Sequence, residues 1–170
     1  MLTRRAFTLS SFALAAAGWP IASSRADEEA VSISKPKSEY EIEHTPEEWH
    51  RILTPEQFNV LREHGTERAG SSPLDKTYAA GTYLCAGCEL PLFSSETKFN
   101  SGTGWPSFYR PLPNAVGDST DKSYFMTRTE IHCRRCGGHL GHVFKDGPPP
   151  TGLRFCMNGV ALKFVPADAG

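Results

Sequence analysis

The fold of this chain is organised around the stretch Cys133-Arg134-Arg135-Cys136-Gly137, in which two cysteines enclose two other residues. An earlier stretch, Cys85-Ala86-Gly87-Cys88, has the same cysteine spacing. Such a turn directs two sulfur atoms at one centre, and a glycine in or just after it lets the backbone bend without a Cβ clash. Two such turns supply the closed shell of four thiolates that is typical of structural zinc. We expect one structural Zn²⁺ per chain, clamping two distant hairpins through Cys85, Cys88, Cys133 and Cys136.

Other uses of these four cysteines stay open at this point. Two disulfides are an alternative in an exported protein, which meets an oxidising environment. A redox dithiol of the thioredoxin type needs a helix that begins at the first cysteine, whereas glycine or proline follows closely behind both pairs. Iron accepts the same four ligands as zinc. We favour zinc because the spacing within each pair is that of a metal knuckle.

The chain beyond Gly70 has the composition of short strands. Thr82–Leu84 leads into the first cysteine pair and Pro91–Phe93 leaves it, while Ser123–His132 mixes β-branched and aromatic residues before the second pair. Gly159–Val165 alternates large apolar residues with smaller or charged ones. These patterns predict antiparallel sheets with one buried face. We therefore expect a mainly β fold of the α+β type.

Two helix starts precede the strands. Thr45-Pro46-Glu47-Glu48 and Thr54-Pro55-Glu56-Gln57 each place threonine at the N-cap, proline at the first helical position and an acid or amide two residues later. Both patterns predict a capping box. Trp49 is expected to be a core anchor, and Gly65 is expected to end the second helix. The fold therefore has a short helical N-terminal element.

Residues 1–26 have the features of a cleaved secretory signal peptide. Arg4 and Arg5 precede an apolar run that is too short to span a bilayer comfortably. The arginine pair and the Ala-Phe-x-Leu that follows favour the twin-arginine export route, with a general secretory signal as the alternative. We predict a bacterial periplasmic protein in which residues 27–43 form a linker or surface arm and residues 44–170 form the functional domain.

The composition of the 170-residue chain suits one globular domain, because 39% of its residues are hydrophobic and 22% are charged. The formal net charge of −1 gives no electrostatic reason to expect nucleic acid as a partner. The segment after the signal has no basic run suited to lipid headgroups. We expect no stable membrane association, and we expect a monomer.

The fifth cysteine, Cys156, has no partner nearby and lies in the stretch Gly152–Asn158, between Arg154 and Asn158. A free cysteine is often a buried, inert small hydrophobe. Once the other four cysteines hold a metal, however, Cys156 is the thiol left for chemistry. We therefore treat it as a candidate nucleophile.

Two further stretches carry candidate site residues. Trp105 lies between a glycine and a proline, so its indole either walls a pocket or belongs to the core beneath a loop. His139 and His142 follow the second cysteine pair; they could be metal ligands, core histidines or proton carriers. Because Gly141 argues against a helix here, a loop that points both histidines inward is expected.

Three stretches, SGTGWPSF, CRRCGGHLGHVF and GLRFCMN, together with the two cysteine pairs, resemble methionine sulfoxide reductases of the B type. The resemblance extends from Thr45 to Val165. It implies a β-rich fold, a structural zinc, and a reductase for the R epimer of methionine sulfoxide in oxidised proteins or peptides. It also assigns the domain at residues 44–170 to this activity.

The resemblance also implies roles for individual residues. Cys156 matches the nucleophile, and His139 and His142 match the pair that binds and protonates the sulfoxide oxygen. The residues that match the substrate-positioning set are Trp105, Arg154 and Asn158. Phe155 stands where many members have tyrosine, so a hydroxyl is absent there.

The implied chemistry is attack of the Cys156 thiolate on the sulfoxide sulfur, which leaves a sulfenic acid on that cysteine. We expect Arg154 or a protonated histidine to lower the thiol pKa. Thr103 occupies the position where many members carry a resolving cysteine. With no second thiol, the sulfenic acid has to be reduced by an external thiol, either a thioredoxin-like protein or a small thiol.

Two rival functions predict different features of the structure. A non-catalytic zinc-ribbon-like binding module would keep Cys156 buried and its histidines structural. A metal-dependent hydrolase would use His139 and His142 to bind a further metal ion.

Overall fold

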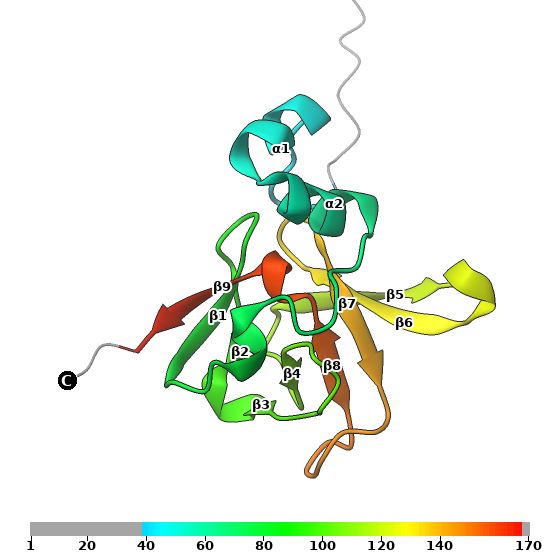
Figure 1. Cartoon of the computed structure of the whole chain (residues 1–170). Coiled ribbons are helices and arrows are strands. Elements are labelled where there is room, and N and C mark those ends of the chain that lie inside the picture. Colours follow the sequence, from blue (N-terminus) through cyan, green and yellow to red (C-terminus); the bar gives the residue numbers. More distant parts are fainter. Residues whose placement is uncertain (1–38, 168–170) are drawn as a thin grey trace, which may run out of the picture. The chain divides into compact units, whose positions relative to one another are not determined.

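The structure is a computed structural model that describes residues 39–167. The predicted signal peptide at residues 1–26, and the part of the predicted arm before residue 39, lie outside the described residues. Within the described range, two α-helices come first and two antiparallel sheets follow (Figure 1). The prediction of a mainly β fold with a short helical N-terminal element is confirmed. Neither described helix has the length and apolar character needed to cross a bilayer.

The two helices, α1 (Pro46–Ile52) and α2 (Pro55–Glu63), both begin as the sequence predicts. The Thr45 hydroxyl accepts a hydrogen bond from the N–H of the third helical residue, whose carboxylate accepts from the Thr45 N–H in return. Thr54 begins α2 with the same reciprocal pair. Each cap contributes about 1 kcal/mol to the stability of a helix that is otherwise too short to form alone.

The end of α2 differs in detail from the prediction. The C-cap is His64, which adopts the left-handed conformation (φ 56°, ψ 30°), rather than Gly65. Gly65 is required for space: its N–H donates to the Asn59 carbonyl at 2.9 Å, and a Cβ there would lie 2.9 Å from that same oxygen. This turn projects the His64 imidazole away from the helix and toward the larger sheet.

The strands form two antiparallel sheets. The smaller sheet has the order β2 (Pro91–Ser94), β1 (Gly81–Cys85) and β9 (Leu162–Pro166). The larger sheet has the order β3 (Lys98–Phe99), β4 (Ser107–Phe108), β8 (Arg154–Met157), β7 (His139–Phe144), β6 (Arg128–Cys133) and β5 (Val116–Asp121). Short 3₁₀ helices join them: η1 (Pro73–Lys76), η2 (Ser95–Thr97), η3 (Ser123–Phe125) and η4 (Gly159–Ala161).

Two predicted strands begin later than expected. The stretch 123–132 starts with η3, because the Asp121 carboxylate accepts the Ser123 N–H at 2.8 Å and turns the chain. The stretch 159–165 starts with η4, because the Glu67 carboxylate accepts the N–H groups of residues 159 and 160 at 2.7 and 2.9 Å. In both cases a side-chain carboxylate captures backbone donors that a strand would need.

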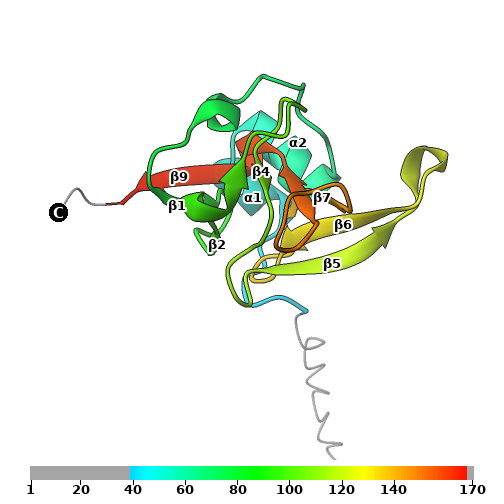
Figure 2. The same cartoon turned by 90° about the horizontal axis from the view of Figure 1, so that it is seen from below.

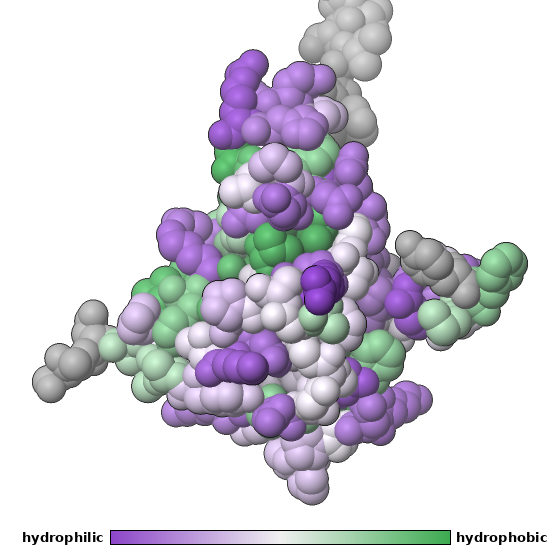
Figure 3. Space-filling model, viewed as in Figure 1, coloured by the Kyte–Doolittle hydropathy of each residue, from purple (hydrophilic) through white to green (hydrophobic). Residues whose placement is uncertain are grey.

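Strands β5 and β6 form a hairpin that projects from the rest of the domain (Figures 1 and 2). Its tip carries Phe125, fully exposed, and Met126, half exposed. In Figure 3 the projecting tip is hydrophobic, while the surface between the tip and the rest of the domain is mostly polar. The hairpin base, by contrast, supplies charged side chains to the site described below.

The core lies between the two sheets and the helices. Tyr83, Phe93 and Phe108 are fully buried, with the rings of Phe93 and Phe108 stacked at 4.4 Å between centroids. Leu140 and Met157 complete the core from β7 and β8. Trp49 is 4% exposed, so the predicted role of a core anchor is confirmed. Each such apolar side chain stabilises the fold by roughly 1.5–3 kcal/mol through burial.

Candidate active site and metal centre

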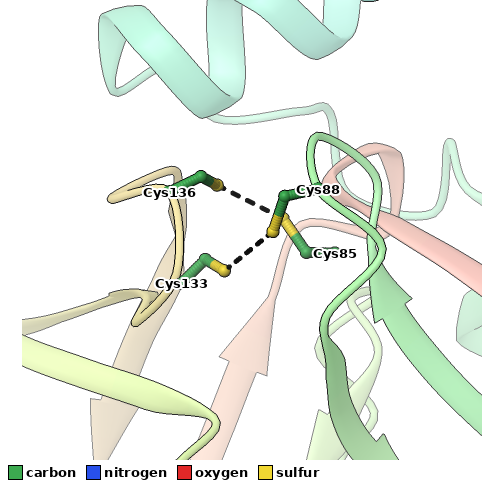
Figure 4. A group of neighbouring side chains, drawn as sticks. All are labelled: Cys85, Cys88, Cys133 and Cys136. Carbon is green, nitrogen blue, oxygen red and sulfur yellow. Dashed lines mark hydrogen bonds between the residues drawn. The ribbon is translucent and has the colours of Figure 1, made fainter. Parts of the chain in front are cut away.

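The four paired cysteines meet at one point (Figure 4). Cys85 and Cys133 end strands β1 and β6, and Cys88 and Cys136 lie in the turns that follow. The Sγ atoms of Cys85 and Cys136 are 3.8 Å apart, those of Cys88 and Cys133 are 3.5 Å apart, and all four lie within 4.8 Å of one another. Tetrahedral zinc with Zn–S bonds of about 2.3 Å needs sulfurs about 3.8 Å apart. The arrangement fits that ion, and all four cysteines are free.

The two knuckles share a backbone pattern. The N–H groups of Glu89 and Gly137 each donate at 2.8 Å to the carbonyl of the cysteine four residues earlier. Both residues have positive φ, 57° and 67°. The first knuckle therefore bends at Glu89, and a Cβ at Gly87 would make only an ordinary contact with Trp49, at 3.5 Å. The expectation that a glycine makes the bend is confirmed for the second knuckle and wrong for the first.

Cationic side chains surround the cysteine cluster. The Arg62 guanidinium of α2 donates twice to the Cys136 carbonyl at 3.1 Å, and Arg135 donates to the Cys88 carbonyl at 3.3 Å. The surface arm also reaches this region, since Ile42 N–H donates to the Arg135 carbonyl at 3.0 Å. Four thiolates around a divalent ion carry net negative charge, which these arginines offset.

Cys156 lies in the middle of the larger sheet, on β8. Its cross-strand partners are Ser107 on β4 and His142 on β7. Directly opposed residues project from the same face of a sheet with Cβ atoms about 4.5–5.5 Å apart. The three side chains therefore share one face of the sheet, over which lies a pocket of about 120 Å³. It is lined by Thr66, Trp105, Arg128, Gly141, His142, Phe144, Cys156 and Asn158. Phe155, next in the strand, points the opposite way into the core.

A chain of hydroxyl groups leads to the Cys156 sulfur. Ser107 Oγ lies 2.7 Å from Ser101 Oγ, which lies 2.8 Å from Thr103 Oγ1. Thr103 Oγ1 is in turn 3.9 Å from Cys156 Sγ. This network orients the Thr103 hydroxyl beside the sulfur.

The electrostatics of Cys156 differ from the expectation. Burial raises the pKa of its thiol, and contacts with Thr103, Arg154 and Ser107 lower the pKa without cancelling that rise. The expectation that Arg154 or a protonated histidine gives the thiol a lowered pKa is therefore wrong for the net shift, although Arg154 itself acts in the expected direction. Asp146 engages the Arg154 guanidinium with two hydrogen bonds of 2.9 Å, which offsets part of the positive charge beside the thiol.

His139 and His142 lie on strand β7 rather than in the expected loop. Side chains three residues apart in a regular strand point to opposite faces, but these two rings lie 5.4 Å apart. The pairing of β7 with β6 is irregular at His139, and Gly141 between them has a φ of 156°. A Cβ at Gly141 would overlap the Cys156 carbonyl oxygen, so this strand distortion requires glycine.

Each histidine has a carboxylate partner from the β5–β6 hairpin. His142 Nε2 lies 2.8 Å from Asp121 Oδ2, which also accepts a 2.6 Å hydrogen bond from Arg128. His139 Nδ1 lies 2.6 Å from Glu130 Oε1. The His139 residue is 2% exposed, and its Nε2 has no partner among the described residues. One nitrogen of His139 is thus held in place while the other is left for a ligand.

These contacts shift the pKa values of the acids and of His139. Hydrogen bonds, above all from the Ser123 N–H, hold the pKa of Asp121 well below its usual range. Burial raises the pKa of Glu130, but hydrogen bonds from Ser119 and His139 outweigh it and the net pKa is lowered. Burial lowers the pKa of His139 despite the opposing effect of Glu130. His139 is therefore a neutral imidazole near pH 7.

Trp105 and Asn158 both contact the loop after α2. The Trp105 indole is half buried, lines the pocket, and donates to the Glu67 carbonyl at 3.2 Å. Asn158 is buried: its Oδ1 accepts the Glu67 N–H at 3.0 Å and its Nδ2 donates to the Leu140 carbonyl at 3.1 Å. Trp105 therefore forms a pocket wall, whereas both ends of the Asn158 amide bind this chain's own backbone.

The structure brings Cys156, His142, Trp105 and Asn158 to one pocket and sets His139 beside His142. Arg154 lies at its edge, over the Phe144 ring at 4.5 Å. Sequence reasoning missed the three acids Asp121, Glu130 and Glu67. The one available signal was Glu130, an acid inside an otherwise β-branched and aromatic stretch.

Comparison with known proteins matches the SelR domain to residues 53–166. A peptide methionine sulfoxide reductase MsrB of Leptospira interrogans is 56% identical over 126 residues, which are 74% of this chain and 96% of that protein. This chain belongs to the MsrB family. The MsrB proteins of Agrobacterium fabrum and Methanosarcina barkeri are 55% and 54% identical over 70% and 76% of this chain, and 89% and 92% of their own lengths. The recognition from sequence is confirmed.

Proposed function

We propose that this MsrB-family protein reduces the R epimer of methionine sulfoxide in proteins to methionine, with Cys156 as the nucleophile. The observation that carries the proposal is the position of Cys156. It lies in a pocket with Trp105 and His142, while the other four cysteines of the chain occupy a separate cluster. A methyl sulfoxide is small enough for such a pocket, and an indole wall suits its methyl group.

Cys156 sulfur attacks the sulfoxide sulfur as the sulfoxide oxygen gains a proton. Because burial keeps the pKa of the thiol raised, the thiol loses its proton only as the oxygen accepts one. We infer that His142, opposite Cys156 on the next strand, carries that proton. His139 donates its Nδ1–H to Glu130 in the neutral ring, so its Nε2 can accept a proton and pass it to the oxygen. The methionine thioether departs, and the oxygen atom ends on Cys156 as a sulfenic acid.

Regeneration uses two external thiols. The first condenses with the sulfenic acid to give a mixed disulfide and water, and the second releases Cys156 as a thiol and leaves with the first as a disulfide. Thr103, the group closest to the sulfur in the hydroxyl network, cannot take this role. A thioredoxin-like protein or a small thiol is the reductant that this chemistry requires.

Cys85, Cys88, Cys133 and Cys136 would hold one Zn²⁺, which supplies structural cross-linking between the two sheets and no step of the reaction. The approach of all four sulfurs to within 4.8 Å of one another supports one shared zinc over two separate disulfides. The arginine pair and apolar run of residues 1–26 support twin-arginine export to the periplasm.

The decisive experiment compares wild type with Cys156→Ser on peptides that carry R- or S-methionine sulfoxide. We expect turnover of the R epimer alone, and complete loss of turnover in the variant with an unchanged circular dichroism spectrum. Equal activity of the variant would overturn the proposal and favour a metal-binding module without catalysis.

A further inference from the structure

A second group of metal-ligating side chains lies at the edge of the active site. Glu130 Oε1 is 2.6 Å from His139 Nδ1 and 2.9 Å from His64 Nδ1. The three ligand atoms all lie within 4.8 Å of one another. The residues come from three elements, namely the C-cap of α2, strand β6 and strand β7. Nothing in the proposed reaction uses His64.

Two imidazole nitrogens and one carboxylate oxygen form a ligand set that suits zinc and similar divalent ions. Tetrahedral zinc with bonds of about 2.0–2.1 Å places its ligand atoms about 3.3 Å apart. The Glu130 contact with His64 would therefore have to lengthen by about 0.4 Å, and the contact with His139 by about 0.7 Å. His64 can make its share of this adjustment because its side chain is 65% exposed, whereas the His139 contact has to lengthen between two buried side chains.

The cluster is open to solvent through a pocket of about 470 Å³. The pocket is lined by all three ligand residues, by acidic and hydroxyl side chains such as Asp121 and Ser123, and by the basic side chains of Lys122 and Arg128. A hydrated cation can enter, and a water molecule can serve as its fourth ligand. Glu130 is already fixed for this role by a 2.5 Å hydrogen bond from Ser119 to its other oxygen.

We propose that His64, Glu130 and His139 bind one zinc-class divalent cation from solution, and that this binding reversibly inhibits the reductase. The claim that the cation binds depends only on the geometry of the cluster. The claim that binding inhibits the enzyme rests on the proposed function, in which His139 takes part in the reaction. When the cation binds His139 Nδ1, the single N–H proton of the neutral ring moves through solvent from Nδ1 to Nε2. Nε2 then has no lone pair with which to accept a proton, so the ring no longer takes part in proton transfer to the sulfoxide oxygen.

The binding test uses protein whose cysteine site already holds one equivalent of zinc. Zn²⁺ is titrated by calorimetry into wild type, His64→Asn, Cys156→Ser and the control His50→Asn. Asparagine tolerates the left-handed conformation of position 64, and His50 is an exposed histidine of α1 outside the cluster. We expect wild type, Cys156→Ser and His50→Asn to bind a second equivalent of Zn²⁺. The affinity of His64→Asn for this second equivalent should be at least about tenfold lower. Mg²⁺ should not bind.

Equal binding of the second equivalent to wild type and His64→Asn would overturn the proposal. Loss of that equivalent in Cys156→Ser would also overturn it, because the catalytic thiol would then be the ligand.

Inhibition is measured in a single turnover of pre-reduced enzyme, without added thiol, because thiols bind zinc. We expect micromolar Zn²⁺ to suppress methionine formation in wild type and His50→Asn, and to leave His64→Asn active at its normal rate. Binding without inhibition would overturn the regulatory half alone. A wild type that forms no methionine even without zinc would overturn the proposed function, while the calorimetric result would still stand.

Discussion

Thr103 Oγ1 lies 3.9 Å from Cys156 Sγ, at the end of a hydroxyl chain that begins at the buried Ser107. A hydroxyl at this place can stabilise charge on the sulfur by hydrogen bonding, but it cannot form a disulfide. The residue at position 103 therefore determines whether oxidised Cys156 forms an internal disulfide or is reduced by a thiol from solution.

Thr103→Cys is expected to convert the protein to an internal disulfide mechanism. One equivalent of sulfoxide substrate, given without reductant, should yield a disulfide between the introduced thiol and Cys156 in the variant, and a dione-trappable sulfenic acid in wild type. Intact mass spectrometry distinguishes the two products, and Thr103→Ser is the matched control that should behave as wild type. An internal disulfide in wild type would contradict the scheme.

The charge balance between Arg154 and Asp146 is expected to set the nucleophilicity of Cys156. Arg154 lowers the pKa of the thiol, so Arg154→Met should move the pH profile of Cys156 alkylation to higher pH. Asp146→Asn frees the guanidinium from its partner and should move that profile to lower pH. The measurement is the rate of iodoacetamide labelling of Cys156, followed by mass spectrometry from about pH 6 to about pH 10, a range that brackets the usual thiol pKa. Shifts of the same sign in both variants would refute the interpretation.

Glu130 is expected to act as a positioning residue for His139. Glu130→Gln should lower kcat about tenfold with little change in KM, because the ring loses its charged anchor while the pocket around Cys156 is kept. Ser119→Ala, which removes a hydrogen bond to the same carboxylate but keeps its charge, should have a smaller effect. Thermal denaturation is the control: if both variants lose stability and activity in parallel, Glu130 has only a structural role.

Removal of metal from the four-cysteine site is expected to unfold the domain. The cluster joins the ends of β1 and β6, which belong to different sheets, and structural zinc supplies folding free energy directly. A strong chelator, or Cys136→Ser, should abolish the cooperative thermal transition, whereas Cys156→Ser should retain one zinc and an unchanged Tm. A chelated protein that keeps its fold but loses activity would point to a catalytic metal.

Much of the fold could be predicted from local chemistry. The two capped helix starts, the cysteine turns and the apolar alternation of β9 depend on neighbours within a few residues. The beginnings of η3 and η4 could not be predicted, because Asp121 and Glu67 form them by binding backbone N–H groups. Glu67 acts on residues that lie 92 and 93 positions further along the chain, where periodicity carries no information.

The candidate site shows the same division. Cys156, Trp105 and the two histidines stand in recognisable motifs, but their carboxylate partners come from a different hairpin. The direction of the pKa shift of Cys156 could not be predicted from the sequence either, because it depends on burial and on the pairing of Arg154 with Asp146. Neither burial nor a competing partner can be read from the residues beside a cysteine.

The last turn of α2 touches both chemical centres of the molecule. Arg62 binds the carbonyl of the metal-cluster residue Cys136, and two residues later His64 binds Glu130, the partner of His139. Expulsion of the metal by a strong oxidant would free Cys136 and with it the anchor of this turn. Because loss of this metal is expected to unfold the domain, such an oxidant would abolish activity without having to reach the Cys156 sulfur.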